Sequence, residues 1–241
     1  MVTYTGPAKR SGLFFVMART KPFSWITYVS PCMLSLHSFK KSFGDQLILD
    51  IPQLDFAKGI HWVKGKNGSG KSTLFNCLAG LSPYKGSIKL GEYDLQKQPE
   101  TYRMLVNYSQ SEPAFPEFLK GDELIGFFAR LKQAKEDQTN ELKNLLGVEA
   151  YAHQACGAYS SGMLKKLSIL LAFLGQPEWI ILDEPLITLD KEAQAVVTEL
   201  VAAQKDRGCS FLFATHQDFE NDLIKATATY EVKNQTISQT A

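Results

Sequence analysis

A glycine-rich segment at residues 65–73 has the residue types and spacing of a phosphate-binding loop. It follows the pattern G-x-x-x-x-G-K-[ST] between an expected strand, Gly59–Lys64, and a helix beginning near Lys71. Glycines let successive main-chain N–H groups point at phosphate oxygens, and the helix N-terminus adds partial positive charge. Lys71 would contact the β- and γ-phosphates, and the hydroxyl of Ser72 would bind Mg²⁺. The residues assigned to a nucleotide site are Gly65, Asn67, Gly68, Ser69, Gly70, Lys71, Ser72 and Thr73.

Two acidic residues, Asp183 and Glu184, follow a short apolar run at residues 179–182. Ligands of open α/β sheets bind at the carboxyl ends of strands, so we expect these acids to face the phosphate loop. Asp183 suits the Mg²⁺ shell, and Glu184 could polarise the water that attacks the γ-phosphate. Alone, the pair could simply mark a strand meeting a solvated turn. His216 follows a second apolar run, Ser210–Ala214, and could hydrogen-bond the γ-phosphate and steer that water.

The rest of the sequence predicts an α/β core with a helical insertion. Wholly apolar runs of four or five residues are typical of central parallel strands covered by helices on both faces. Alternating apolar and polar residues predict half-buried strands, and apolar residues at helical spacing predict amphipathic helices. The further expected strands are 34–40, 46–51, 87–90, 104–108, 229–232 and 236–238, and the expected helices are 122–135, 140–146, 160–174 and 191–205.

Composition indicates an ordinary globular protein of 241 residues, with 44% hydrophobic and 21% charged residues. The net charge of +1 gives no global field for nucleic acid. The four cysteines include no CxxC pair, which predicts reduced thiols. No apolar run approaches the roughly 20 residues that a membrane-spanning helix needs. Residues 1–32 are basic and lack a clear period. We expect this segment to be a disordered extension, or translated sequence that precedes a true start codon at Met33. The alternative is a targeting peptide or a basic arm that touches a membrane.

Residues 34–238 together resemble the ABC ATPase family. The segment Tyr159–Met163, followed by Leu164-Lys165-Lys166, resembles the family signature, usually Leu-Ser-Gly-Gly-Gln before a basic helix. Residues 184–190 resemble the family's Glu-Pro…Leu-Asp stretch. Tyr159, Ser161 and Met163 depart from the commonest signature residues, whereas Ser160 and Gly162 keep the hydroxyl and the close backbone approach that phosphate contact requires.

The resemblance assigns roles to residues outside the two phosphate-site motifs. It implies that Gln110 contacts Mg²⁺ and takes part in catalysis, that Phe43 stacks on adenine, and that Asp190 is the D-loop aspartate. It also implies that Ser160, Ser161 and Gly162 contact a second subunit's ATP. The alternatives are a core aromatic at Phe43, a solvated loop residue at Gln110, and a signature that only caps its helix.

The fold implied by the resemblance is a P-loop NTPase core with an ABC-type antiparallel β subdomain and a helical signature subdomain. The ABC ATPase domain would cover residues 33–241, with the helical subdomain at about 111–174.

The function implied is that of an ATP-hydrolysing subunit that powers a membrane transporter. Two subunits, in a homo- or heterodimer, would close head to tail over ATP and Mg²⁺ and drive a separate transmembrane permease. The chain would then be cytoplasmic and peripheral on the inner face of the membrane. The segment Ser111–Leu119, with Phe115 and Phe118, is expected to receive a helix of that partner. The alternative is a soluble ABC ATPase acting on a nucleic-acid or protein assembly; the single phosphate loop and absence of a heptad insert or basic face disfavour it.

Overall fold

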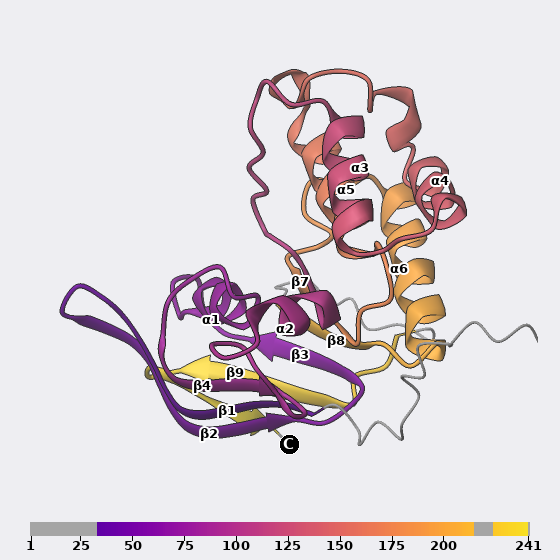
Figure 1. The fold of residues 1–241 in the computed structure, drawn as a ribbon. Helices are drawn as coiled ribbons and strands as arrows, with labels where there is room; N and C mark the ends of the chain where they lie inside the picture. The colour runs from indigo at the N-terminus through magenta and orange to yellow at the C-terminus, as the bar shows by residue number, and fades with distance from the viewer. Residues whose placement is uncertain (1–32, 215–223, 241) are drawn as a thin grey trace, which may run out of the picture.

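The computed structural model describes residues 33–214 and 224–240, and these form two β-sheets and a helical lobe (Figure 1). The expected N-terminal extension, residues 1–32, lies outside the described residues, as does His216.

The six-stranded sheet has the order β10-β9-β3-β8-β7-β6. The five strands from β9 to β6 run parallel, and β10 pairs antiparallel with β9 as the expected hairpin. Because parallel strands end at a common edge, the segments that follow β3, β6, β7 and β8 meet there. The strands are β3 (Ile60–Lys64), β6 (Val106–Ser109), β7 (Trp179–Asp183), β8 (Ser210–Ala214), β9 (Ala228–Lys233) and β10 (Thr236–Thr240).

The second sheet is antiparallel, with the order β2-β1-β4-β5, and confirms the expected β subdomain. Its first two strands form a hairpin that turns at Gly44 and Asp45. A main-chain hydrogen bond of 2.7 Å from Asp50 to the carbonyl of Gln235 links this sheet to the β9–β10 turn. The strands are β1 (Leu34–Phe43), β2 (Gln46–Phe56), β4 (Lys85–Leu90) and β5 (Tyr93–Asp94).

Helices α1 and α2 lie beside the sheets, whereas α3, α4 and α5 form a lobe on the other side, with α6 alongside (Figure 1). Helix α5 also packs against β6 and β7 of the parallel sheet. We call residues 111–174 the helical lobe. The helices are α1 (Lys71–Leu78), α2 (Pro99–Leu105), α3 (Gly121–Leu131), α4 (Glu136–Leu145), α5 (Ser161–Ala172) and α6 (Lys191–Asp206), with 3₁₀ turns at Val148–Ala150 and Cys156–Ala158.

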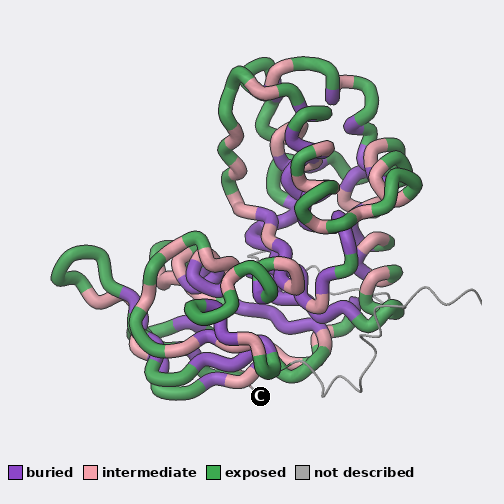
Figure 2. Tube along the Cα trace, viewed as in Figure 1, coloured by how far each residue is buried: buried purple, intermediate pink, exposed green. Residues whose placement is uncertain are grey.

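Two apolar clusters make the core, one on each side of the parallel sheet. Because both faces are covered, every residue of β7 and β8 is buried, as Figure 2 shows for the sheet region. One cluster joins the sheet to α6 and to the helical lobe, of which α5 is a part. The other joins it to α1, α2 and the antiparallel sheet.

The expected strand 104–108 is partly wrong, since Met104 and Leu105 belong to the end of α2 and the strand begins at Val106. Tyr102 is the buried residue of α2, so the helix carries no apolar period that would predict it. Its sequence signals are Pro99 in the first helical turn followed by the acidic Glu100.

Candidate nucleotide site

The phosphate loop joins the end of β3 to the start of α1, as the sequence predicts. The loop has three glycines with positive φ angles: 153° at Gly65, 77° at Gly68 and 104° at Gly70. Residues with a side chain rarely adopt such angles, so the loop needs glycine at these positions. A Cβ on Gly65 would lie 2.7 Å from the Val232 carbonyl oxygen. The α1 N-terminus has no side-chain cap and no acidic residue in its first turn, which leaves its N–H groups available to an anion.

Lys71 is the buried lysine of the loop and is 7% exposed, whereas Lys66 is exposed. Its ammonium donates to the carbonyl oxygens of Gly65 at 2.8 Å and Lys66 at 3.2 Å. Burial lowers the pKa of Lys71, while the nearby charges of Glu184 and Asp183 act in the opposite direction. The structure therefore brings the loop lysine and both strand-tip carboxylates into one site.

Asp183 closes β7 and is 1% exposed. Burial raises the pKa of this carboxyl; the Ser72 hydroxyl, the charges of Lys165 and Lys71, and the Tyr108 hydroxyl oppose the shift. Tyr108 donates to Oδ2 at 3.4 Å.

The oxygens at this point fit a magnesium ion. Oδ1 of Asp183 is buried and has no hydrogen-bond partner among the described residues, and the Ser72 hydroxyl lies beside the same carboxylate. Mg²⁺ prefers oxygen ligands and is held by one or two protein groups together with substrate phosphates and waters. Within the described ranges no group of three or more His, Cys, Asp or Glu residues is placed to hold a metal by itself.

Glu184 follows Asp183 with a positive φ of 48° and is 8% exposed. Its main-chain N–H donates to the carbonyl oxygen of Ala214 at 2.8 Å, so the ends of β7 and β8 are tied together here. Residues after Ala214 up to residue 223, which include His216, lie outside the described part of the chain.

Gln110 follows β6 at the same edge of the sheet and is partly exposed. Its carbonyl oxygen accepts a 2.7 Å hydrogen bond from the ammonium of Lys165, which also donates to the Asp183 carbonyl oxygen at 3.1 Å. Burial lowers the pKa of Lys165 to about 8, against the charges of Asp183, Glu184 and Glu112. The sequence interpretation did not assign a role to this lysine; the available signal was a cation two positions before Leu167, where the apolar part of the helix begins.

The signature residues lie at the N-terminus of α5, with Ser160 and Ser161 exposed. The hydroxyl oxygen of Ser160 accepts a 3.2 Å hydrogen bond from the N–H of Met163, so it does cap the helix. A hydroxyl can still donate its own proton while it accepts, so this cap is compatible with a phosphate contact. A Cβ on Gly162 would lie 2.9 Å from the Thr188 carbonyl oxygen, so Gly162 allows close packing on the 184–190 segment.

Asp190 caps α6 at the end of that segment. Its carboxylate accepts from the N–H of Ala193 at 2.8 Å and pairs with Lys166 at 3.2 Å. These two interactions lower the pKa of Asp190.

Phe43 is 55% exposed at the end of β1, which contradicts a core position and leaves its ring available for stacking. The ammonium of Lys41 lies 4.4 Å from the ring centroid. The β1–β2 hairpin approaches the phosphate loop, because a Cβ on Gly70 would lie 3.3 Å from side-chain atoms of Ile48 and Leu49.

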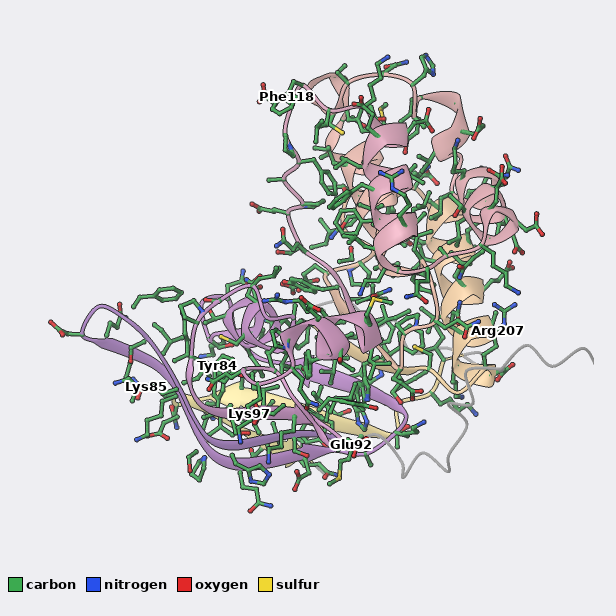
Figure 3. All side chains as sticks on the ribbon, viewed as in Figure 1. Tyr84, Lys85, Glu92, Lys97, Phe118 and Arg207 are labelled. Atoms are coloured by element: carbon green, nitrogen blue, oxygen red, sulfur yellow. The ribbon has the colours of Figure 1, made fainter. Side chains whose placement is uncertain are left out.

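A cleft of about 810 Å³ lies between α2, residues 113–116 and α3, and we call it the interlobe cleft. Gln110 and Phe115 belong to its lining. Phe118 does not line it; this side chain is 79% exposed and lies at the outer end of the helical lobe (Figure 3).

Comparison with known proteins supports the interpretation of these motifs. The sequence profile of the ABC transporter family matches residues 52–187, more than half of the chain. The "Uncharacterized ABC transporter ATP-binding protein YxlF" of Bacillus subtilis is 35% identical over 158 residues, covering 63% of this chain and 51% of that protein. The "Spermidine/putrescine import ATP-binding protein PotA" of Marinobacter nauticus is 30% identical over 194 residues, covering 78% and 52%. The chain thus spans about half the length of these curated relatives.

A solved structure described as "Structure of ATP binding subunit of ABC transporter" superposes with a TM-score of 0.76 at 25% identity, covering 87% of this chain and 90% of that one. The likeness covers most of the chain and agrees with the fold that the motifs predict. The family profile, the fold and the arrangement of loop, lysine and carboxylates agree: the chain belongs to the ABC transporter family, and its fold is that of an ABC ATPase domain.

Proposed function

We propose that the chain binds and hydrolyses ATP with Mg²⁺ and powers an ABC membrane transporter through ATP-driven dimerisation. The observation that carries the proposal is the meeting of Lys71 with Asp183 and Glu184 at the edge of the parallel sheet. This arrangement places a cation for phosphate beside two carboxylates, one for the metal and one for water. The likeness to ATP-binding subunits of transporters supports the same assignment.

Each residue of the site has one task in this proposal. The loop N–H groups and Lys71 hold the phosphates, and bound Mg²⁺ would neutralise charge on the β- and γ-phosphate oxygens. Ser72, Asp183 and Gln110 would hold the ion. Glu184 would accept the proton of the attacking water, with His216 assigned to the γ-phosphate from sequence.

The exposed signature residues supply the proposal for dimerisation. The N-terminus of α5 has no acidic residue in its first turn, so its partial positive charge is available to an anion from outside the subunit. Ser160, Ser161 and Gly162 would contact the γ-phosphate of ATP held by a second copy or a related subunit. ATP would then stabilise the closed pair, and hydrolysis would release it.

The interlobe cleft supplies the proposal for a permease partner. Its lining is mainly apolar and includes Phe115, Leu124 and Phe128. A cleft of this kind fits the apolar face of a partner's helix. None of the described helices is long and apolar enough to cross a membrane. Phe115→Ala should weaken co-purification with detergent-solubilised membrane protein; undiminished association would remove this step.

Glu184→Gln tests the proposal directly. The amide keeps the shape of the side chain but cannot take up the proton, so turnover should fall by about 10²- to 10⁴-fold. ATP binding should persist, and ATP with Mg²⁺ should shift the variant to a dimer in size-exclusion chromatography.

Glu178→Gln is the matched control, because Glu178 precedes the same strand at its opposite end and pairs with Lys58 at 3.0 Å. This variant should hydrolyse ATP like the wild-type protein. Wild-type hydrolysis by Glu184→Gln, or failure of the wild-type protein to bind Mg·ATP, would reject the proposed function.

A further inference from the structure

Lys165 is a buried cation in the second turn of α5, and its side chain is 1% exposed. Removing a charge from water costs free energy unless polar partners replace the solvent. In the described part of the chain its ammonium forms no ion pair, and its partners are two main-chain carbonyl oxygens. An apolar side chain would avoid the desolvation cost, so the presence of a lysine calls for an explanation.

The two acceptors belong to the nucleotide site. One is the carbonyl of Gln110, at 2.7 Å, and the other is the carbonyl of Asp183, at 3.1 Å. These residues follow and end two neighbouring parallel strands, β6 and β7. Gln110 and Asp183 are both assigned to Mg²⁺, so a single ammonium holds the main chain of two assigned metal ligands.

The helix that carries Lys165 also begins at the signature. Ser160 is the N-cap of α5, only five positions before the lysine. A displacement of α5 would therefore move the hydrogen-bond donor that Gln110 and Asp183 share. Lys165 connects the helical lobe to both residues at once.

We propose that Lys165 is a positioning residue for ATP hydrolysis, whose ammonium fixes Gln110 and Asp183 relative to each other and to the signature helix. This inference rests on the proposed function. Without the ammonium, the two carbonyls would face an apolar side chain and the Gln110 segment would shift away from Asp183. A misplacement of about 1 Å at a reacting centre can cost about 100-fold in rate.

Two substitutions of Lys165 in the full chain test the inference, and a third variant serves as their control. Lys165→Met keeps the length and removes the donors; we expect kcat to fall about 10- to 100-fold while KM for ATP changes less than about threefold. Lys165→Gln keeps two N–H donors on a shorter, neutral side chain, and should recover part of the lost kcat. Both should also require more Mg²⁺ for half-maximal rate, which a general loss of stability would not produce.

Asn107→Leu is the matched structural control. Asn107 donates to the carbonyl oxygens of Ala172, at 2.7 Å, and Leu174, at 2.9 Å, and so joins β6 to the far end of α5. Its removal also deletes two hydrogen bonds, but these join β6 to the last residue of α5 and to Leu174 just beyond it, at the opposite end of the helix from the signature. It should lower the thermal midpoint and leave kcat and the Mg²⁺ requirement near wild type.

The outcomes separate the inference from the proposed function. If the wild-type protein does not hydrolyse ATP, the proposed function fails. If it does, and Lys165→Met turns over at the wild-type rate, only the positioning role fails. Equal losses of kcat in Lys165→Met and Asn107→Leu would also overturn it. If Lys165→Met does not fold, Lys165→Gln is compared with Asn107→Leu instead. A kcat and a Mg²⁺ requirement in Lys165→Gln that are as close to wild type as those of Asn107→Leu would reject the positioning role of Lys165.

Discussion

Gly65→Ala should destabilise the protein through two separate costs. The φ angle of 153° disfavours any side chain, a strain of roughly 1–3 kcal/mol. The new Cβ would also lie 2.7 Å from the main-chain oxygen of Val232 on β9, and relieving such a contact costs roughly 1–3 kcal/mol. We expect a loss of roughly 2–6 kcal/mol in urea unfolding without nucleotide, and a thermal midpoint roughly 5–20 °C lower.

Gly68→Ala separates the two costs within the same loop. Gly68 also has a positive φ, of 77°, but a Cβ there would meet no atom within 4 Å. Only conformational strain remains, so the loss should be roughly 1–2 kcal/mol. If Gly65→Ala proves no more destabilising than Gly68→Ala, the contact with β9 does not constrain the loop and the reasoning is refuted.

Three further predictions concern buried or capping groups. Burial lowers the pKa of His61, so the unfolded chain binds a proton that the folded protein excludes; stability should fall as the pH drops below about 6.5. The thermal midpoint of His61→Phe should depend less on pH between 7 and 5. Burial raises the pKa of Cys77 to about 11 and that of Cys209 to about 12, so mass spectrometry should find both unmodified by iodoacetamide at pH 8 until denaturant is added. Asp190→Ala removes the α6 cap and should lower the thermal midpoint more than Asp190→Asn, which keeps the acceptor.

The central strands and the site motifs could be predicted from sequence because their signals are local. The runs at 179–182 and 211–214 are wholly apolar, and runs this short are typical of strands covered on both faces rather than of helices. The acidic pair closes the first of these runs, and the phosphate loop follows β3, which pairs in parallel with β8. The rule that parallel strands share a carboxyl edge then brings them together without knowledge of the packing.

Other features depend on contacts between distant segments and left no local signal. The buried side chain of Tyr102 donates to the Leu78 carbonyl oxygen at 2.9 Å, which helps to place α2 against α1. The interlobe cleft forms only when α2, residues 113–116 and α3 come together. The bridge made by Lys165 is equally non-local, because its acceptors lie 55 and 18 positions away in the chain.

The conformation of Glu184 explains how two adjacent acids can serve one site. Successive side chains of an extended strand point to opposite faces of the sheet, so Asp183 and Glu184 would be separated if β7 simply continued. The charges of both carboxylates nevertheless oppose the lowering of the Lys71 pKa by burial. The positive φ of Glu184 ends the alternation directly after Asp183, and the 2.8 Å hydrogen bond to the Ala214 carbonyl holds this turn. A positive φ at a residue with a side chain costs roughly 1–3 kcal/mol. The positive φ thus stands where the alternating strand pattern gives way to two adjacent carboxylates that both lie near Lys71.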